Sequence, residues 1–317
     1  MRAAILLLAL SPCLPGAELV SARGEVGVRR GGAAVVPIKA GQRLGGGDLL
    51  VTGEGGFARI RLRDESVASV GANSRYLLSE DSDPSDRSGT KTMLVSGSVQ
   101  MDLSRIKKLY AGKSESHKFY TPTAICGVRG TQFAVYSDKN GRTRTRVTEG
   151  EIAVSGDVLG DDARVSAGKP VAKGGGFASD KGGALSTAAP KLPGEREAAK
   201  SLSGKPKPDG EYEAFYISLV QDLSDRITGL KERFDGLQAE VGRLSKTGED
   251  LVRAGKAREA AAPAEEARLR GLESFVVRKE IVHRAHQFRG YLALLENSGL
   301  NLPQAERIQK IYLDITR

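Results

Sequence analysis

The chain has no tryptophan, two cysteines and three histidines among its 317 residues, and aromatic residues make up only 5% of it. Two cysteines are too few for a disulfide framework or a thiolate zinc site, and three histidines leave little for a histidine-based active site. No internal segment approaches the roughly 20 consecutive apolar residues of a membrane-spanning helix. These shortages exclude a disulfide-stabilised miniprotein, a thiolate zinc protein and a multi-span membrane protein.

Positive charge, by contrast, is in excess, with a formal net charge of +9. A basic chain first suggests nucleic-acid binding. More than half of the excess lies in residues 163–210, which carry a net +5, whereas residues 211–317 are neutral. The charge therefore does not predict a basic folded face, and the N-terminal segment argues further against nucleic acid as a partner.

Residues 1–17 have the features of a secretory signal peptide. Arg2 gives a positive start, an apolar run of about eight residues extends from Ala3 to Leu10, and small residues end the segment at Ala17. We expect cleavage near Ala17 and export to the periplasm or cell envelope. The run Leu10-Ser11-Pro12-Cys13 also has the outline of a lipoprotein box, so the alternative is acylation of Cys13, which would attach the protein to a membrane.

Residues 18–162 have the alternation and turn chemistry of a β domain. Apolar and charged residues alternate from Arg59 to Arg63, as in a half-buried strand. We predict one hairpin through the turn at residues 64–66, a second around Gly97, and a third through Asn140-Gly141, a pair that favours a tight turn. Short strands with glycine-rich turns predict a mainly β sandwich or barrel.

Within this region the chain resembles the FecR domain family. The resemblance rests on the run from Gly47 to Thr52, on the run from Thr121 to Phe133 and on Val147 to Val154, and it covers roughly residues 24–155. The motif positions are Gly47, Asp48, Thr52, Thr121, Pro122, Gly127, Arg129, Gly130, Thr131, Glu149 and Gly150.

The motif residues have the chemistry of structural turns. Glycines permit positive φ angles or close backbone approach, and short Asp and Thr side chains hydrogen-bond nearby backbone. Arg129 would reach a buried carbonyl or carboxylate, or else a ligand at the surface. Cys126 lies in an apolar run and is predicted to be a small buried side chain.

The best-known FecR proteins regulate sigma factors and take a signal from an outer-membrane receptor through a periplasmic domain. The resemblance implies for this chain a free-standing exported form, without the sigma-factor-binding domain. Its expected role is therefore the binding or sensing of a partner in the envelope.

Residues 163–210 contain nine glycines and five prolines, with one aromatic residue, Phe177. Such a composition buries too little apolar surface to offset the entropy of ordering, so this segment is predicted to be a flexible basic linker.

Residues 211–317 are predicted to be helical. Apolar residues follow Tyr216 at alternating spacings of four and three, which makes four heptads. We call this series the association stripe: Val220, Leu223, Ile227, Leu230, Phe234, Leu237, Val241 and Leu244. A second helical run covers residues 264–296, and a short helix covers residues 308–315.

Two arrangements of these helices stay open: an antiparallel hairpin that turns at residues 260–263, or a coiled coil between chains for self-association. In a parallel dimer Arg226 would face Lys231 of the other chain, so charge does not favour that arrangement. His283 and His286 have no third ligand nearby, so they are predicted to be surface residues and no metal is expected.

The sequence contains no phosphate-binding loop, nucleophile elbow, zinc-binding helix or paired carboxylates in an apolar setting. We therefore expect a non-catalytic protein without cofactors, which binds an unidentified envelope protein or cell-wall component and not nucleic acid. Two alternatives are a regulatory component of cell-surface signalling that acts on a membrane partner, and a structural module that holds peptidoglycan or the anionic envelope through the linker lysines.

Overall fold

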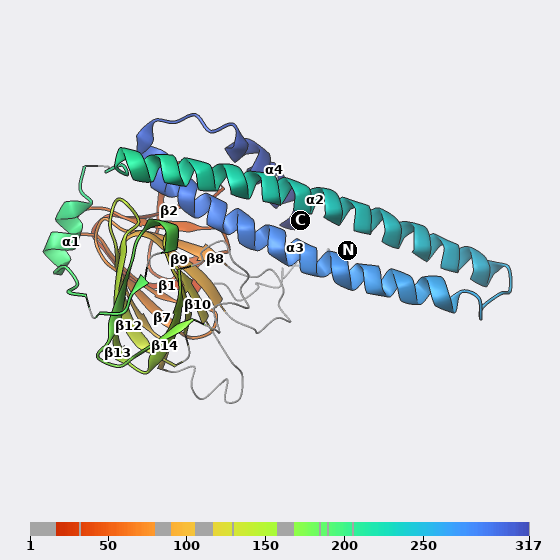
Figure 1. Ribbon diagram of the computed structural model, residues 1–317, viewed down its shortest axis with the longest axis horizontal. Helices are drawn as coiled ribbons and strands as arrows, with labels where there is room; N and C mark the ends of the chain where they lie inside the picture. The colour runs from red at the N-terminus through yellow and green to blue at the C-terminus, as the bar shows by residue number, and fades with distance from the viewer. Residues whose placement is uncertain are drawn as a thin grey trace, which may run out of the picture.

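The fold is taken from a computed structural model, which describes residues 17–31, 33–79, 90–104, 117–128, 130–156, 168–183, 185–188, 190–204 and 206–316. A two-sheet β domain packs against a long helical hairpin that projects well beyond it (Figure 1). The expected signal segment, with Cys13, and the motif residue Arg129 lie outside the described residues. Among the described residues, no helix is long and apolar enough to cross a membrane.

Nine strands form sheet A, which is antiparallel throughout. Its order is β4 (Arg43–Leu44), β1 (Ala17–Arg23), β6 (Phe57–Arg61), β7 (Val67–Val70), the second half of β9 (Thr90–Asp102), β12 (Gln132–Ser137), β13 (Thr143–Glu149), β16 (Gly176–Ser179) and β17 (Leu185–Ser186). The predicted hairpins β6–β7 and β12–β13 are both confirmed.

Sheet B is built the same way around the first half of β9. Its order is β3 (Val36–Pro37), β2 (Val26–Arg29), β5 (Leu49–Thr52), β8 (Arg75–Ser79), β9, β10 (His117–Tyr120), β11 (Ile125–Val128), β14 (Glu151–Ser155) and β15 (Lys169–Ala172). Only the pairing of β10 with β9 is parallel. The described strands form an open sandwich and not a closed barrel.

Strand β9 is the centre of both sheets, and it corrects one prediction. The chain does not reverse at Gly97; it continues from sheet B into sheet A. Gly97 has a φ of +108°, and a Cβ there would lie 2.1 Å from the Ser74 Oγ. The glycine therefore allows the strand to bend between sheets rather than to turn back.

Successive residues of sheet B point into two different cores. Those facing sheet A are Leu50, Tyr76, Leu78, Leu94, Phe119 and Cys126; those facing the helices are Leu49, Leu77, Met93, Val95, Tyr120 and Ile125. Sheet B is thus buried on both faces, which is why its strands have consecutive apolar residues instead of the alternation seen in β6.

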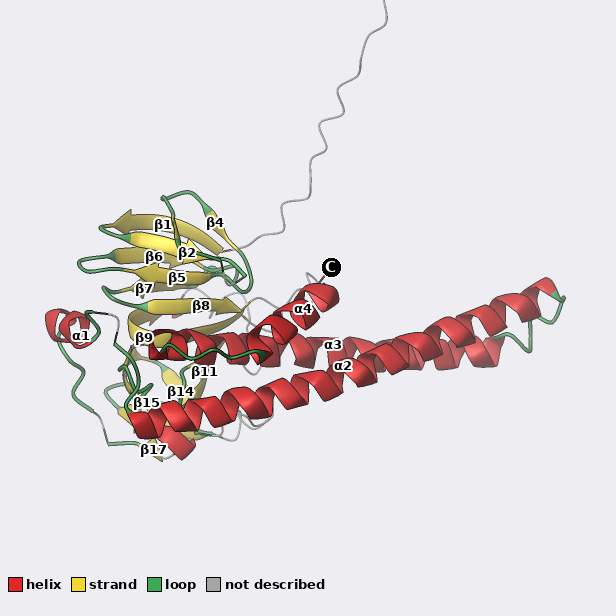
Figure 2. Ribbon diagram, turned by 90° about the horizontal axis from the view of Figure 1, so that it is seen from above, coloured by secondary structure: helices red, strands yellow, loops and turns green. Residues whose placement is uncertain are grey.

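The C-terminal region is an antiparallel hairpin, which is the first of the two arrangements that the sequence left open. Helix α2 (Gly210–Arg253) and helix α3 (Ala261–Leu295) are joined by residues 254–260, where Gly255 has a φ of +77°. A short 3₁₀ turn η4 (Glu296–Ser298) leads to α4 (Gln304–Thr316), which folds back beside both helices (Figure 2). Ion pairs such as Arg233–Glu273 at 2.6 Å link α2 to α3.

The hairpin is not a separate module, because the first half of α2 and the second half of α3 share one hydrophobic core with sheet B. Tyr216, Phe288 and Tyr291 are at most 1% exposed within this core. Full burial of a large apolar side chain stabilises a fold by about 1.5–3 kcal/mol, so this core holds the two parts together.

The segment predicted to be a flexible linker differs most from expectation. It contributes β15 at the edge of sheet B, β16 and β17 at the edge of sheet A, a 3₁₀ turn η3 (Lys181–Gly183) and helix α1 (Glu195–Ser201). Strands β15 and β16 each bury one large apolar side chain, Val171 and Phe177. This is enough to hold them, because the existing sheet edge supplies the backbone hydrogen bonds. Composition alone underestimates such edge strands.

Candidate functional site

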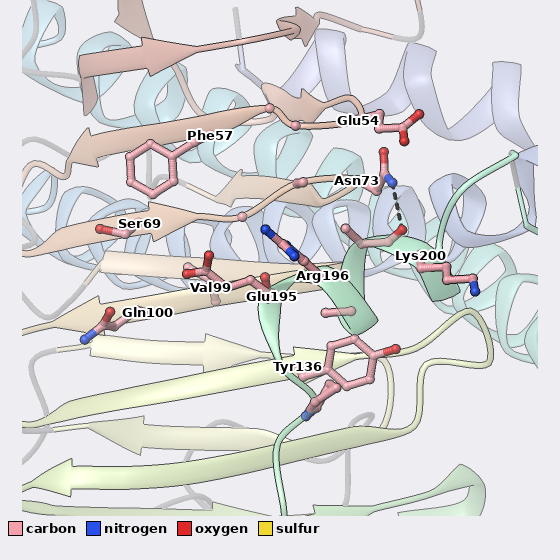
Figure 3. Close-up of a pocket in the computed structure, with 18 of the residues that line it drawn as sticks. Glu54, Phe57, Ser69, Asn73, Val99, Gln100, Tyr136, Glu195, Arg196 and Lys200 are labelled. Atoms are coloured by element: carbon pink, nitrogen blue, oxygen red, sulfur yellow. Dashed lines mark hydrogen bonds between the residues drawn. The ribbon is translucent and has the colours of Figure 1, made fainter.

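The helical hairpin packs on the outer face of sheet B, and the outer face of sheet A carries a groove. The groove has a volume of about 800 Å³ and runs between the sheet and helix α1 (Figure 3). Its walls come from the end of β1, the turns at residues 54–56 and 71–73, strands β6, β7, β9 and β12, and residues 192–203. The strands of the FecR-like region therefore form its floor. The segment predicted to be a linker forms the wall opposite the sheet.

A row of residues in register across five strands crosses the outer face of sheet A, and its three central members line the groove. Arg59, Ser69, Gln100, Ala134 and Arg146 are successive partners from β6 to β13, and all point away from the inner core. Small and amide side chains occupy the centre, and an exposed arginine stands at each end. The row offers hydrogen-bond donors and acceptors in the middle and positive charge at both ends.

Helix α1 is fixed to the sheet by two hydrogen bonds and a small apolar cluster. The Tyr136 hydroxyl lies 2.7 Å from the Ser201 Oγ, and the Asn73 Nδ2 donates to the carbonyl of Ala199 at 2.8 Å. Tyr136 also packs with Ala198, Leu202 and Leu192. Burial raises the pKa of the Tyr136 phenol, so the hydroxyl stays neutral at physiological pH.

The rim of the groove has charges of both signs. Glu54, Glu195, Arg196 and Lys200 line it, and the Arg23 guanidinium lies 5.9 Å from the centre of the Phe57 ring. The site therefore combines one half-buried aromatic contact with mixed charges, which suits recognition of a polar, irregular partner rather than of a small apolar ligand.

Among the described residues that line the groove there is no histidine or cysteine. Among the described residues, no group of three or more His, Cys, Asp or Glu side chains is placed to hold a metal ion. The one histidine of the β domain, His117, lies in the interior: its Nδ1 donates to the Asp64 Oδ2 at 3.1 Å, and its Nε2 is 3.0 Å from the Thr92 Oγ1. His117 and Thr92 are 0% exposed and Asp64 is 7% exposed, so this network faces the core and not the groove.

Electrostatics within that buried network are balanced by its hydrogen bonds. Burial by itself would raise the pKa of Asp64, but the hydrogen bond and charge of His117, with two bonds from Ser66, hold it below its usual range. The carboxylate is therefore ionised and fully used in structural contacts.

Most of the described motif residues hold turns together rather than line the groove. Asp48 accepts from the Gly45 backbone at 3.0 Å, Thr52 donates to the Gly71 carbonyl at 2.6 Å, and Thr131 donates to the Glu151 carbonyl at 2.7 Å. Thr121 accepts from the Ala124 N–H at 3.0 Å, and Gly150, with a φ of +79°, closes the β13–β14 turn.

The remaining motif positions are at strand ends or meet the hairpin. Gly127 lies in buried β11, Gly130 precedes β12, and Glu149 ends β13 and is exposed. Two positions contact the helices: Gly47 lies under the Arg289 guanidinium, and the Pro122 carbonyl accepts from the Tyr291 hydroxyl at 3.4 Å.

The association stripe faces inward. Val220, Leu223, Ile227 and Leu237 are buried in the core shared with α3 and sheet B, and the other four are partly buried: Leu230, Phe234, Val241 and Leu244. The heptads of α2 therefore form the hairpin itself, and self-association would need a different surface.

The two helix histidines correct another prediction. His283 and His286 are 8% and 3% exposed rather than on the surface, since α3 packs against sheet B and α4 at this point. The His283 ring lies 5.3 Å from that of Tyr120, and the His286 ring lies 5.4 Å from that of Tyr312. Burial, together with the charge of Arg289, holds the pKa of His286 well below its usual range. Cys126 is 0% exposed as predicted, and burial raises the pKa of its thiol.

Sequence reasoning missed the groove because its residues belong to no motif. From the sequence, Ser69, Gln100 and Tyr136 could be recognised only as residues of strands. Helix α1 lies in the segment that was predicted to be a linker. One signal was present: the run Glu195-Arg196-Glu197-Ala198-Ala199-Lys200 consists entirely of strong helix formers, flanked by Leu192 and Leu202.

Part of the β domain matches a known protein family. Residues 48–153 match the family described as FecR protein. The matched range begins at the motif residue Asp48 and ends within β14, so it includes the central strands of both sheets and most of the groove floor, whereas α1 and the hairpin lie outside it. A comparison with curated proteins finds no match to the chain.

Proposed function

We propose that this chain, which carries a FecR domain at residues 48–153, is a non-catalytic exported envelope protein that binds a partner in the groove on sheet A. One observation carries the proposal: the hairpin covers the outer face of sheet B, while the outer face of sheet A carries an open groove of about 800 Å³. The domain thus has one face for its own helices and one face for a partner.

The chemistry of the groove favours a polypeptide segment as that partner. The polar centre of the floor at Ser69 and Gln100 matches backbone amides and carbonyls, which both donate and accept hydrogen bonds. Phe57, Arg23 and Arg196, which also line the groove, would hold side chains of the bound segment. An envelope protein fits this pattern better than a cell-wall polymer, because sugar rings stack on exposed aromatic faces, and of the two aromatic residues that line the groove, Phe57 and Tyr136, the second is only 8% exposed.

Export is supported by the signal-peptide features of residues 1–17. Strand β1 begins at Ala17, and Ala17 pairs with Leu44 in sheet A. Cleavage near Ala17 would therefore fall at the start of β1 and leave the other described strands in the mature protein. Acylation of Cys13 remains the alternative, and it would place the domain on a short tether at a membrane surface.

A role in cell-surface signalling is the second candidate function, and the family match favours it. The FecR family is associated with the regulation of signalling at the cell surface. In this second candidate function the polypeptide in the groove belongs to a membrane receptor, and the hairpin would transmit its binding.

The alternative of a module that holds an anionic polymer depended on lysines in a flexible linker. Some of these lysines, such as Lys169 and Lys181, lie on folded strands and turns instead.

The test is cross-linked purification of the tagged protein from envelopes of producing cells. Ser69→Trp fills the centre of the groove, and Thr148→Trp places the same ring on the same outer face of sheet A but outside the groove. We expect a discrete co-purified partner with the wild-type protein and with Thr148→Trp, and its loss with Ser69→Trp. Equal recovery of the partner with both variants would refute the groove as its binding site.

A further inference from the structure

The part of the hairpin that projects beyond the β domain carries an exposed apolar face on α3. We call it the arm stripe: Leu269, Leu272, Phe275 and Val276, which are 51%, 53%, 40% and 63% exposed. Leu269, Leu272 and Val276 have the three-and-four spacing of a single helix face. The side of α3 that meets α2 is different, since Glu273, Ser274 and Val277 make the contacts there.

The arm stripe continues a face that is already an interface. Seven residues beyond Val276, His283 packs on Tyr120 of β10, and seven residues further Gly290 lies against Met93 of β9. The same heptad position is therefore covered by sheet B in the second half of α3 and exposed in the first half. A helix face with this continuity is built for packing along its whole length.

We propose that the arm stripe binds a second copy of this chain, so that two α3 helices pack antiparallel about a two-fold axis near Leu272. This goes beyond the function proposed above, which concerns the groove on sheet A. It also moves self-association from the inward-facing association stripe of α2 to the outer face of α3.

The position of sheet B determines the direction of the second helix. From His283 onward the face is occupied by the sheet, so a parallel second α3 would run into the β domain. An antiparallel helix needs only the exposed part of the face. That part extends from Ala261, the first residue of α3, to Glu280, since every residue from Ile281 to Phe288 is buried, and Leu272 lies near its middle.

Charge supports the same register. Glu265 and Lys279 lie seven residues on either side of Leu272, so antiparallel packing brings each Glu265 opposite Lys279 of the other copy. Leu269 then faces Phe275, and Leu272 faces itself. Because a two-fold axis uses one surface twice, a face complementary to itself in charge and shape specifies a second copy rather than an unrelated partner.

Sedimentation velocity over a range of micromolar concentrations tests the association. The full chain, with Cys13→Ser, is expected to be a dimer that dissociates on dilution, and Leu272→Glu is expected to be a monomer at every concentration. Val252→Glu is the matched control, since Val252 is 57% exposed on α2 away from the arm stripe. A monomeric parent protein, or a Leu272→Glu variant that dimerises like the parent, would overturn the proposal.

Disulfide cross-linking tests the register in the same background. Cys126 is 0% exposed and does not interfere. Leu272→Cys is expected to form a covalent dimer, whereas Val276→Cys is not, because antiparallel packing separates the two copies of residue 276 by about 12 Å along the helix axis. Cross-linking at both positions would show parallel packing, and cross-linking at neither would show no α3 contact; each result contradicts the proposal.

Discussion

Tyr216 of α2 and Tyr291 of α3 stack with their ring centres 5.6 Å apart, and both hydroxyls reach backbone carbonyls of the FecR domain. Tyr216 donates to Asn140 at 2.7 Å, and Tyr291 donates to Pro122 at 3.4 Å. Pro122 is a motif residue and Asn140 belongs to the β12–β13 turn. The two tyrosines thus join the helical hairpin to the β domain at Pro122 and at the β12–β13 turn.

Removal of the Tyr216 hydroxyl should weaken this junction. Tyr216→Phe keeps the stacked ring but leaves the buried Asn140 carbonyl without its donor, which costs about 1–3 kcal/mol of unfolding free energy. Tyr291→Phe should cost less, since its bond is longer. Urea denaturation of both variants measures the difference, and equal stability of Tyr216→Phe and wild type would contradict the role given to this bond.

Alanine substitutions at two glycines distinguish the cost of backbone strain from the cost of disturbing a contact with the hairpin. Gly41 and Gly47 have nearly the same φ, +85° and +84°. A Cβ on Gly41 meets nothing within 4 Å, whereas a Cβ on Gly47 would lie 2.2 Å from the Arg289 Nη1. Gly41→Ala should therefore show only the strain, about 1–2 kcal/mol, and Gly47→Ala should lose more. If both alanine variants lose the same stability in urea denaturation, Arg289 does not pack on this turn as described.

The Asp64–His117 bond predicts a pH dependence of stability. The pKa of folded Asp64 lies below its ordinary value of 3.8, so the folded protein holds this proton less tightly than the unfolded chain does. The stabilisation is therefore present at neutral pH, starts to fall as the pH nears 3.8, and is lost below the folded-state pKa.

Asp64→Asn should accordingly be less stable than wild type at pH 7, by about 1–3 kcal/mol, with a smaller gap in acid. The measurement is the free energy of unfolding from pH 7 down to pH 3 for both proteins. Exposed Asp209, Glu265 and Glu273, whose pKa values are also lowered, titrate in both and cancel in the comparison. A gap that stays constant with pH would be the contrary result.

Helix α1 should detach locally when its two anchors are removed. Tyr136→Phe together with Asn73→Ala removes the bonds to Ser201 and Ala199 while the sandwich core stays intact. Hydrogen exchange of the α1 amides should become at least tenfold faster, with little change at β9 and β12. Ser203→Ala, whose hydroxyl bonds only within its own turn, is the control and should leave α1 exchange unchanged.

Local patterns in the sequence account for much of the fold. The alternation in β6, the Asn140-Gly141 turn and the heptads of α2 each depend on neighbours in the chain, and each predicted its element correctly. Leu49-Leu50-Val51 and Met93-Leu94-Val95 also held the information that sheet B is covered on both faces, since a sheet open to water on one side would alternate.

Other features depend on contacts between distant segments, which local patterns do not contain. Strands β15 and β16 form because they pair with β14 and β13 at the sheet edges, and not because their own composition favours an ordered structure. His283 and His286 are buried because a sheet some 160 residues earlier lies beneath them. The groove was missed for the same reason: its floor and α1 come together only in the folded chain.

Photo-cross-linking from single sites in the producing cell tests most directly whether the groove on sheet A binds a partner. A photoreactive residue at Gln100 lies on the groove floor, and one at Lys173 lies in the β15–β16 turn outside the groove. We expect a single adduct of defined mass from position 100, none from position 173, and loss of the adduct when Ser69→Trp fills the groove. Absence of any adduct at position 100, or the same adduct from both positions, would contradict it.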